Sequence, residues 1–208
     1  MASGHQNAVR HLQQVDERLK VVIRAVGACR FEPAGGRFEV LARSILAQQI
    51  SVHAARTIFT RLRRQLPGRR VSARGIAQLS DEQLQAAGIS SQKRGYLRDL
   101  TNRTLSGQVS FRRLPRLSDD AVIEELIQVK GVGRWTAQMF LQFGLGRPDI
   151  FAPDDLGLQN AMKRLYASGA DLSRDDMVQI ASAWSPWRSI ASWYLWRSLE
   201  LDSDNDLF

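Results

Sequence analysis

The chain has 208 residues, of which 44% are hydrophobic and 24% charged, and its formal net charge is +8. This apolar fraction argues against a mainly disordered chain, and the length suffices for one or two small domains with a real core. A single cysteine, Cys29, excludes an internal disulfide framework, a cysteine-rich zinc site and a four-cysteine iron–sulfur cluster. The basic excess fits either solubility or binding to nucleic acid, and charge alone does not decide between them.

The sequence carries no sign of a membrane or secretory segment. No apolar run approaches the roughly 18 residues needed to span a bilayer, and residues 1–9 lack the cationic-then-apolar pattern of a secretory signal. We therefore expect a cytoplasmic protein with no membrane association. Residues 202–206 form an acidic tail, opposite in sign to the rest of the chain, which we expect to lie away from any nucleic-acid-binding surface.

Apolar residues recur at helical spacing along almost the whole chain. One such stripe runs from Val9 to Val26, and a second runs from Phe38 to Leu46. Strand signals are sparse, because the chain has no Asn-Gly or Asp-Gly pair and no long alternation of polar and apolar residues. The pattern predicts an all-α protein of about ten helices joined by short loops.

Several helix boundaries are indicated by local signals. Capping residues that open a helix are predicted at Ser80, Ser118 and Ser173. Gly88 would end the helix that Ser80 opens. The pair Ser185–Pro186 has the pattern of an N-cap with proline at the first helical position. Loops are expected at residues 33–36, 67–68, 111–115 and 144–148.

The most informative stretch is residues 126–137, in which two glycines flank one apolar residue. One helix is expected to end near Val129 and a second to start at about Gly133. The glycines permit positive φ and close approach of another backbone. The first amides of the second helix lack intrahelical partners and carry the positive end of its dipole, so that they can bind phosphate. Lys130 and Arg134 add positive charge beside them.

An ordinary tight turn between two helices would also explain two glycines. The wider pattern is more specific, because apolar residues precede, separate and follow them. Residues 126–137 resemble the helix–hairpin–helix motif, which grips the DNA backbone without reading sequence. The resemblance implies DNA backbone contacts from Lys130, Gly131, Val132, Gly133, Arg134 and Thr136.

A pair of carboxylates follows downstream of the hairpin. Asp154 and Asp155 come directly after Pro153, and taken alone both would be interpreted as helix caps. A helix–hairpin–helix followed by a Gly/Pro-rich loop and an aspartate is, however, the signature of a superfamily of DNA glycosylases. The chain resembles its 3-methyladenine DNA glycosylase II branch from about Phe38 to Trp196. The matching segments are residues 38–52, 126–137, 151–155 and 187–196.

The resemblance implies that Asp155 is the catalytic residue and that Asp154 is a helix cap or a supporting residue. Cleaving a base from deoxyribose passes through an oxocarbenium-like transition state. A fixed anion in a water-poor pocket stabilises that positive charge as it develops, and the same carboxylate can align or deprotonate the attacking water. Alkylated purines such as 3-methyladenine and 7-methylguanine are already cationic while they are attached to the sugar, so they need little acid assistance to leave. One carboxylate can therefore suffice.

Superfamily members that also cut the DNA strand use a lysine in the helix after the hairpin as a nucleophile. The corresponding position here is Trp135, which cannot form a Schiff base. The resemblance therefore implies a monofunctional enzyme that leaves an abasic site. The lone Cys29 also separates the chain from the iron–sulfur members of the superfamily.

A glycosylase must take its target nucleotide out of the stack, and the flipped base then needs aromatic walls. The resemblance places Trp135 and Trp196 in the base pocket, where an indole face suits a cationic methylated purine. Met139 and Leu156 stand in this pocket where the best-known family member carries tyrosines, so the pocket is less aromatic and the range of bases is left open. The remaining tryptophans are expected in the core: Trp184, Trp187 and Trp193.

The hole that flipping leaves in the duplex must be filled by a wedge. The resemblance places this wedge at residues 48–51, with Gln49 as the plug and Ile50 next to it. An apolar residue often plays this part, so a glutamine departs mildly from the pattern. Gln48 could instead cap or hydrogen-bond the junction.

The family hairpin also often binds a monovalent cation through main-chain carbonyls. Here the ligands of such a Na⁺ or K⁺ would be the carbonyls of Ile127, Val129 and Val132. We expect no cofactor to be required for the reaction, since the implied chemistry needs only a carboxylate and water.

The resemblance implies the helix–hairpin–helix glycosylase fold, with two helical subdomains flanking an active-site cleft. One subdomain is expected to comprise residues 1–37 and 147–208, and the central bundle residues 38–146. The roughly 37 residues before the match are too few for the β-rich N-terminal domain of larger members, since domains typically need 50 or more. We expect a monomer, because a cleft that encloses DNA needs no second copy.

These observations favour a glycosylase that removes alkylated bases from double-stranded DNA and so begins base excision repair. Two alternatives stay open. One is a glycosylase for another lesion, such as hypoxanthine, uracil or 8-oxoguanine, and the other is a non-catalytic DNA-binding module. The second is less favoured, because backbone binding needs neither the loop 153–155 nor the helix 187–196.

Overall fold

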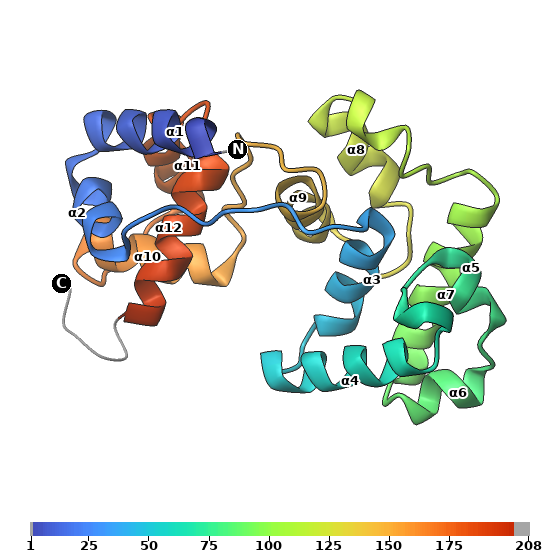
Figure 1. The fold of residues 1–208 in the computed structure, drawn as a ribbon. Helices are drawn as coiled ribbons and strands as arrows, with labels where there is room; N and C mark the ends of the chain where they lie inside the picture. Colours follow the sequence, from blue (N-terminus) through green and yellow to red (C-terminus); the bar gives the residue numbers. More distant parts are fainter. Residues whose placement is uncertain (1, 202–208) are drawn as a thin grey trace. The chain divides into compact units, whose positions relative to one another are not determined.

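The computed structural model of the chain describes residues 2–201, and all regular structure in that range is helical (Figure 1). This confirms the predicted all-α class. The α-helices are α1 (Ala2–Val15), α2 (Glu17–Val26), α3 (Arg37–Ala47), α4 (Val52–Arg64), α5 (Ala73–Gln78), α6 (Asp81–Ala86), α7 (Ser91–Leu105), α8 (Asp119–Leu126), α9 (Arg134–Phe143), α10 (Leu156–Ala167), α11 (Arg174–Ser182) and α12 (Arg188–Leu201). Short 3-10 turns cover Pro67–Arg69 and Leu114–Arg116. None of the helices within the described residues is long and apolar enough to cross a membrane. The predicted acidic tail, residues 202–206, lies outside the described range.

The chain packs as two units. One consists of residues 33–145, and the other joins residues 1–32 to residues 146–208. The boundaries expected from the sequence follow residues 37 and 146, whereas in the structure residues 33–37 belong to the middle unit and Gly146 to the terminal unit. The middle unit is formed by a continuous segment, whereas the other is formed by both ends of the chain.

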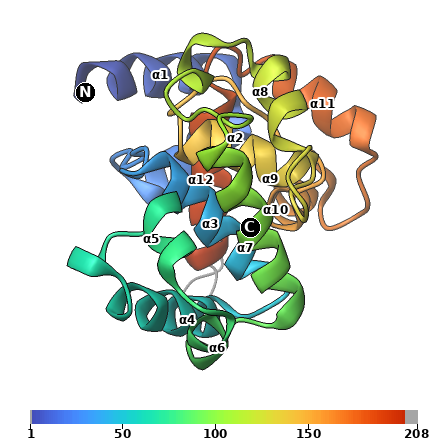
Figure 2. The same ribbon diagram turned by 90° about the vertical axis from the view of Figure 1, so that its right-hand side faces the viewer.

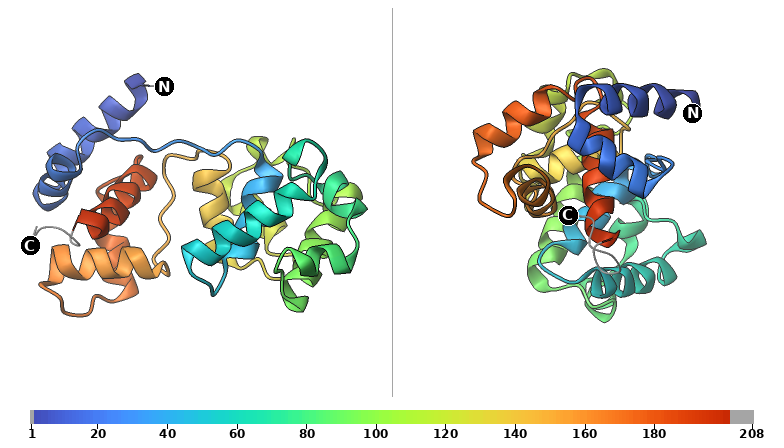
Figure 3. Two further views of the ribbon diagram at one scale, coloured as in Figure 1. Left: turned by 60° about the horizontal axis from the view of Figure 1, so that its bottom comes forward. Right: turned by 90° about the vertical axis from the view of Figure 1, so that its left-hand side faces the viewer.

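The terminal unit is built around α12, which packs against α1, α2 and α10 (Figure 3). Asp16 lies at its centre, because its carboxylate accepts hydrogen bonds from the Tyr166 hydroxyl at 2.6 Å and from the Trp184 indole nitrogen at 2.8 Å. Asp16 also caps α2 by accepting from the amide of Leu19 at 2.8 Å. The apolar stripe from Val9 to Val26 therefore covers two helices, which meet at Asp16. Trp184 is fully buried as predicted, whereas Trp187 and Trp193 are only half-buried.

In the middle unit α3 is central and packs against α4, α7 and α9 (Figure 2). The short helices α5 and α6 lie on α7, and α8 packs on α9. Leu41 and Ile45 of α3 and Phe140 of α9 are fully buried in this core. The two segments predicted to contact DNA, the α3–α4 junction and the α8–α9 hairpin, thus extend from helices of one packed core.

Most of the predicted caps are confirmed. Ser80 and Ser173 each form a capping box, Ser118 caps α8, and Gly88 follows α6 with φ +90°. The prediction at Ser185 is wrong. The Ser185–Pro186 peptide is cis and α12 begins only at Arg188, because the Ser185 hydroxyl donates a hydrogen bond to Asp149 at 2.9 Å instead of capping a helix.

Candidate active site and DNA-binding hairpin

Asp155 stands at the N-cap of α10. One oxygen of its carboxylate, Oδ1, accepts a hydrogen bond from the amide of Leu158 at 2.9 Å and another from the indole nitrogen of Trp196 at 2.8 Å. The residue is only 8% exposed. A carboxylate at a helix N-terminus also faces the positive end of the helix dipole. The structure therefore holds the predicted catalytic carboxylate as a fixed, largely buried acceptor.

Of the two roles expected of the neighbouring Asp154, a helix cap or a supporting residue, the structure excludes the cap, because Asp155 is the N-cap of α10. The Asp154 side chain is exposed and forms an ion pair with Arg174 at 3.3 Å. The expectation that an aspartate caps the following helix is confirmed for Asp155, and the assignment of that cap to Asp154 is wrong. An exposed ion pair of this length contributes little to stability.

Trp196 reaches Asp155 from α12, and Gly157 leaves room for it. A Cβ atom at Gly157 would lie 2.9 Å from Cδ1 of Trp196 and 3.1 Å from Oδ1 of Asp155. Both separations are tighter than ordinary contacts, so only glycine fits beneath the indole ring. The structure thus brings together the predicted catalytic residue and one of the two predicted pocket tryptophans.

The start of α12 is tied to the loop that leads to Asp155. The carboxylate of Asp149 accepts two hydrogen bonds from the Arg188 guanidinium, at 2.7 and 2.8 Å. Ser189 donates to the carbonyl of Arg147 at 2.7 Å and accepts from the amide of Ile150 at 2.9 Å. Partial burial acts against ionisation of Asp149, but the hydrogen bonds from Arg188 and Ser185 outweigh it and lower the pKa of this carboxyl. These contacts fix the helix that carries Trp196 relative to the segment that carries Asp155.

The predicted hairpin is present between α8 and α9. The amide of Val129 donates to the Leu126 carbonyl and that of Val132 to the Val129 carbonyl, both at 3.0 Å. Gly131 adopts φ +78°, and a side chain there would overlap the ring of Tyr96. Gly133 is different, because its φ is −94° and a Cβ atom would meet nothing within 4 Å. Its missing side chain leaves open space in front of the N-terminus of α9.

That N-terminus receives no side-chain cap, since Gly133 is its N-cap. The first amides of α9 therefore receive no hydrogen bond from a capping side chain, which is a condition for an anion site at a helix N-terminus. Lys130 and Arg134 are exposed beside them. The side chains of Val132 and Thr136 are buried, and Thr136 is only 2% exposed, so these two residues could offer only backbone groups to DNA.

The predicted wedge residues form the turn between α3 and α4. Gln48 does not project outward, because its side-chain amide donates to the Gly131 carbonyl at 2.8 Å. This confirms the alternative that Gln48 hydrogen-bonds the junction. Gln49 is exposed and adopts φ +56°, a left-handed conformation that is rare for a residue with a side chain. Ile50 is 37% exposed. The two exposed side chains of the turn are thus those of the predicted wedge, Gln49 as the plug and Ile50 beside it.

The remaining predicted pocket residues are distributed over both units. Trp135 and Met139 lie four residues apart on α9 and so share one face of that helix. Trp135 is 39% exposed, whereas Met139 is buried. Leu156 is the first residue of α10, directly after Asp155, and is 69% exposed. Large apolar side chains that remain this exposed are available to contact a ligand.

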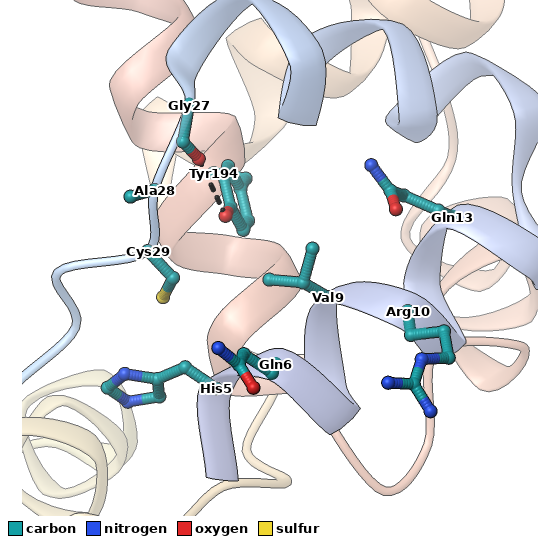
Figure 4. Close-up of a pocket in the computed structure, with 9 residues that line it drawn as sticks. All are labelled: His5, Gln6, Val9, Arg10, Gln13, Gly27, Ala28, Cys29 and Tyr194. Atoms are coloured by element: carbon teal, nitrogen blue, oxygen red, sulfur yellow. Dashed lines mark hydrogen bonds between the residues drawn. The ribbon is translucent and has the colours of Figure 1, made fainter. Parts of the chain in front are cut away.

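A pocket of about 470 Å³ elsewhere in the terminal unit is not this site. It is lined by residues of α1, of the segment after α2 and of α12, among them Cys29 and Tyr194 (Figure 4). The Tyr194 hydroxyl donates to the Gly27 carbonyl at 3.0 Å. Burial raises the pKa values of both Cys29 and Tyr194, so neither provides an anion at neutral pH. The pocket contains neither Asp155 nor Trp196.

The described residues contain no group of three or more His, Cys, Asp or Glu side chains that could hold a metal ion. The hairpin carbonyls of Ile127, Val129 and Val132 are a different donor set. Main-chain carbonyls suit a monovalent cation, and the Val129 carbonyl already accepts the Val132 amide at 3.0 Å with one of its two lone pairs. The chemistry of these donors is therefore compatible with the predicted Na⁺ or K⁺.

Sequence reasoning missed one group of residues, on α7. Lys93, Tyr96 and Asp99 all contact the α3–α4 turn or the hairpin. Their three-residue spacing places them on one helix face, which is a weak signal. No local pattern reveals their partners, which lie 31 to 47 residues away in the chain.

The family model for the HhH-GPD superfamily of base excision DNA repair proteins matches residues 42–187. The chain belongs to this superfamily. Its model spans both the hairpin and Asp155, which agrees with the resemblance inferred from the sequence.

Relatives within the HhH-GPD superfamily cover different shares of the chain. DNA-3-methyladenine glycosylase 1 of Schizosaccharomyces pombe is 31% identical over 196 residues, which are 92% of this chain and 86% of that protein. The YfjP protein of Bacillus subtilis is 39% identical over 125 residues, but these span only 60% of this chain and 44% of that one. The predicted membership in the 3-methyladenine glycosylase branch is thereby confirmed.

A solved structure of the same superfamily shows the same fold. The Schizosaccharomyces pombe 3-methyladenine DNA glycosylase Mag1, in complex with abasic DNA, superposes with a TM-score of 0.86 and 29% identity. The match covers 96% of this chain and all of that one. The helix–hairpin–helix glycosylase fold predicted from the sequence is confirmed.

Proposed function

We propose that this chain is a monofunctional DNA glycosylase that excises alkylated bases, of the 3-methyladenine and 7-methylguanine type, from double-stranded DNA. The observation that carries the proposal is the Asp155 carboxylate, which the Leu158 amide and the Trp196 indole hold in one orientation. The names of the full-length relatives, which are 3-methyladenine DNA glycosylases, support the same substrate class. The reaction would begin base excision repair.

The mechanism follows from what Asp155 can do. As the N-glycosidic bond stretches, positive charge develops on the deoxyribose, and the carboxylate stabilises it. Because Oδ1 is occupied by two donors, Asp155 does not need to reorient when that charge forms. The carboxylate then aligns or deprotonates the water that attacks the sugar. The alkylated base departs as a neutral molecule, so no separate acid is needed.

The positions and ion pairs of the chain's lysines favour hydrolysis over a strand-cleaving reaction with a lysine nucleophile. Trp135 stands where strand-cleaving members carry the lysine nucleophile. In the terminal unit, Lys20 forms an ion pair with Glu17 and Lys163 with Asp171. We therefore expect no covalent enzyme–DNA product when borohydride is added during base release. A trapped product would contradict the monofunctional assignment.

The central test is the variant Asp155→Asn. Asparagine is as good an N-cap as aspartate, so α10 should stay capped while the charge is lost. We expect release of 7-methylguanine from methylated duplex DNA to fall at least about 100-fold, as when a group that stabilises transition-state charge is removed. Binding to abasic DNA should be retained. The exposed Asp154→Asn is the matched control and should keep its activity.

A panel of single-lesion duplexes would settle which bases are released. The resemblance assigns Met139 and Leu156 to the base pocket, at positions where the best-known family member carries tyrosines, so the range of bases is left open. Release of hypoxanthine, uracil or 8-oxoguanine in place of methylated purines would replace the proposed substrate class. Salt-dependent duplex binding with no release of any base would instead indicate a non-catalytic module.

The proposal extends to partners and location. Double-stranded DNA is the proposed partner, held by a monomer through the backbone amides of the hairpin and through Lys130 and Arg134. A Na⁺ or K⁺ at the carbonyls of Ile127, Val129 and Val132 would offset phosphate charge there, and no other cofactor is proposed. A chromosomal substrate implies that the protein acts in the cytoplasm.

A further inference from the structure

One face of α7 holds both segments that are proposed to contact DNA. Lys93, Tyr96 and Asp99 follow each other at three-residue intervals and so line one side of the helix. We call these three residues the brace. Lys93 contacts the α3–α4 turn, while Tyr96 and Asp99 contact the hairpin. All these contacts lie within the middle unit.

At the turn, the ammonium of Lys93 donates hydrogen bonds to two carbonyls, that of Leu46 at 2.8 Å and that of Gln48 at 2.6 Å. The last carbonyls of a helix have no intrahelical partner, and a cation there also meets the negative end of the helix dipole. Burial lowers the pKa of Lys93, which reflects removal of the ammonium from water. Although the ammonium loses hydration here, it donates hydrogen bonds to carbonyls that have no donor within α3.

The second carbonyl matters most, because it belongs to the peptide that precedes Gln49. Gln49 has φ +56°, a left-handed conformation that is unfavourable for a residue with a side chain and persists only where the surrounding structure holds it. By holding the Gln48 carbonyl, Lys93 fixes the plane of the Gln48–Gln49 peptide. The direction in which the Gln49 side chain leaves the turn follows from that plane.

At the hairpin, Asp99 accepts the amide of Lys130 at 2.9 Å, and the ring of Tyr96 lies against Gly131. The turn and the hairpin are also joined directly, because Gln48 donates to the Gly131 carbonyl at 2.8 Å. The plug and the backbone-binding amides therefore belong to one hydrogen-bonded assembly. DNA held at the hairpin would meet the plug in a set position.

We propose that Lys93 is a positioning residue for base flipping, which fixes the plug Gln49 relative to the hairpin without touching DNA or the reacting atoms. This inference rests on the proposed function. It predicts a defect in extrusion of the base and not in duplex binding or in bond cleavage.

The experiment compares Lys93→Met with wild type in single-turnover release of 7-methylguanine placed opposite cytosine or opposite thymine. Extrusion costs least where the base is already mispaired. We expect the variant to lose about 10- to 100-fold in rate on the correctly paired duplex, the effect of losing a charge-assisted hydrogen bond, and much less on the mispaired one. Affinity for undamaged duplex should be unchanged.

Three further variants sharpen the test. Lys93→Arg keeps the charge and the donors and should recover most of the rate. Lys20→Met, which removes a half-buried lysine paired with Glu17, is the matched control and should behave as wild type. Should Lys93→Met fail to fold, Lys93→Gln, which keeps N–H donors without charge, provides the same comparison. An equal loss on both duplexes, or no loss on either, would overturn the proposal.

The fluorescence of a 2-aminopurine placed in the duplex separates this inference from the proposed function. It rises when the base leaves the stack, whether or not any bond is cut. If wild type released no base from any DNA, the proposed function would fail, but the fluorescence of the wild-type complex could still be compared with that of Lys93→Met. Equal fluorescence in the two complexes would overturn the role of Lys93.

Discussion

The most constrained atom of the candidate site is Oδ1 of Asp155, which serves two purposes. It caps α10 through the Leu158 amide, and it also anchors Trp196 through the indole nitrogen. A capping carboxylate is a common feature of helices. What distinguishes this one is the second donor, which ties a proposed wall of the base pocket to the proposed catalyst. The position of Trp196 therefore depends on the space above Gly157.

The variant Gly157→Ala tests this dependence. Alanine at a free helical position stabilises a helix relative to glycine, but here the new Cβ would lie 2.9 Å from Cδ1 of Trp196. The indole must move, and its hydrogen bond to Asp155 must lengthen. We expect the rate of base release to fall about 10- to 100-fold, as is usual when reacting groups are displaced by about an ångström.

A matched control is available in Gly95→Ala on α7, where a Cβ atom would meet nothing within 4 Å. This variant should keep full activity and be as stable as wild type or slightly more so. Thermal unfolding and single-turnover release measured on both variants separate helix propensity from displacement of Trp196. Full activity of Gly157→Ala would show that the Asp155–Trp196 contact is not needed for release.

Between elements, the ion pair of Asp149 with Arg188 joins the loop after α9 to the start of α12. The contact is bidentate and is supplemented by the Arg188 amide at 3.2 Å and by the Ser185 hydroxyl at 2.9 Å. A carboxylate that accepts several hydrogen bonds contributes more to stability than a simple ion pair on the surface does. Because α12 carries Trp196, this contact sets the register of the helix relative to Asp155.

The pKa of Asp149 gives this contact a pH dependence. Burial acts to raise this pKa, but the donors lower it below its ordinary value of 3.8. A lowered folded-state pKa means that the ionised group contributes stability above pH 3.8, and that this stability is lost as the pH falls through the lower folded value. Asp149→Asn should therefore destabilise the fold by about 1 kcal/mol near neutral pH, after allowance for solvent screening of this partly exposed pair.

Urea unfolding at a series of pH values checks this expectation. The difference in free energy of unfolding between wild type and Asp149→Asn should be constant above about pH 5 and should shrink below pH 3.8. The control is Asp154→Asn, whose ion pair is single, exposed and 3.3 Å long, and which should change stability little. If the difference in free energy of unfolding between wild type and Asp149→Asn did not shrink in acid, the effect of the variant would come from lost packing and not from the charge of Asp149.

Helix boundaries could be predicted wherever the signal was local. The caps at Ser80, Ser118 and Ser173 bond to amides three residues away, so a short stretch of sequence contains the whole motif. The failures have distant causes. Ser185 looked like a cap but bonds to Asp149, which is 36 residues away. The apolar stripe from Val9 to Val26 gave no boundary at Asp16, because a capping aspartate can fall on the polar side of an apolar repeat.

The same distinction holds for the candidate site. Asp155 and the hairpin glycines could be identified because the family motif is contiguous. The contact between Asp155 and Trp196 spans 41 residues, and that between Lys93 and Gln48 spans 45. No spacing rule relates residues so far apart when they come from different helices. The brace could therefore be recognised only from the folded middle unit.

Over the whole molecule, the charge of +8 is distributed unevenly. Between residues 40 and 80 every charged side chain is an arginine, and this segment begins with α3 and the plug turn. The hairpin adds Lys130 and Arg134 within the same unit. The basic excess thus lies largely in the unit that carries the proposed DNA contacts. Solubility alone gives no reason for that concentration, whereas binding to a polyanion does.

This distribution predicts how duplex binding responds to salt. Each phosphate contact that is lost lowers the slope of log affinity against log salt by about 0.9. We expect a reduction of that size for Lys130→Ala and again for Arg134→Ala, and roughly the sum of the two for the double variant. The arginines between residues 40 and 80 would leave the double variant with a residual salt dependence.

Titrations of an undamaged duplex at several salt concentrations measure these slopes. Lys20→Ala is the control, because it removes the same unit of charge from a lysine that is paired with Glu17 in the terminal unit. If binding followed net charge alone, all three single variants would lower the slope equally, and the hairpin would not be the site of phosphate contact. A smaller slope only for the hairpin variants would locate the backbone contact at the N-terminus of α9. There the amides have no side-chain cap, and a side chain at the N-cap residue Gly133 would meet nothing within 4 Å.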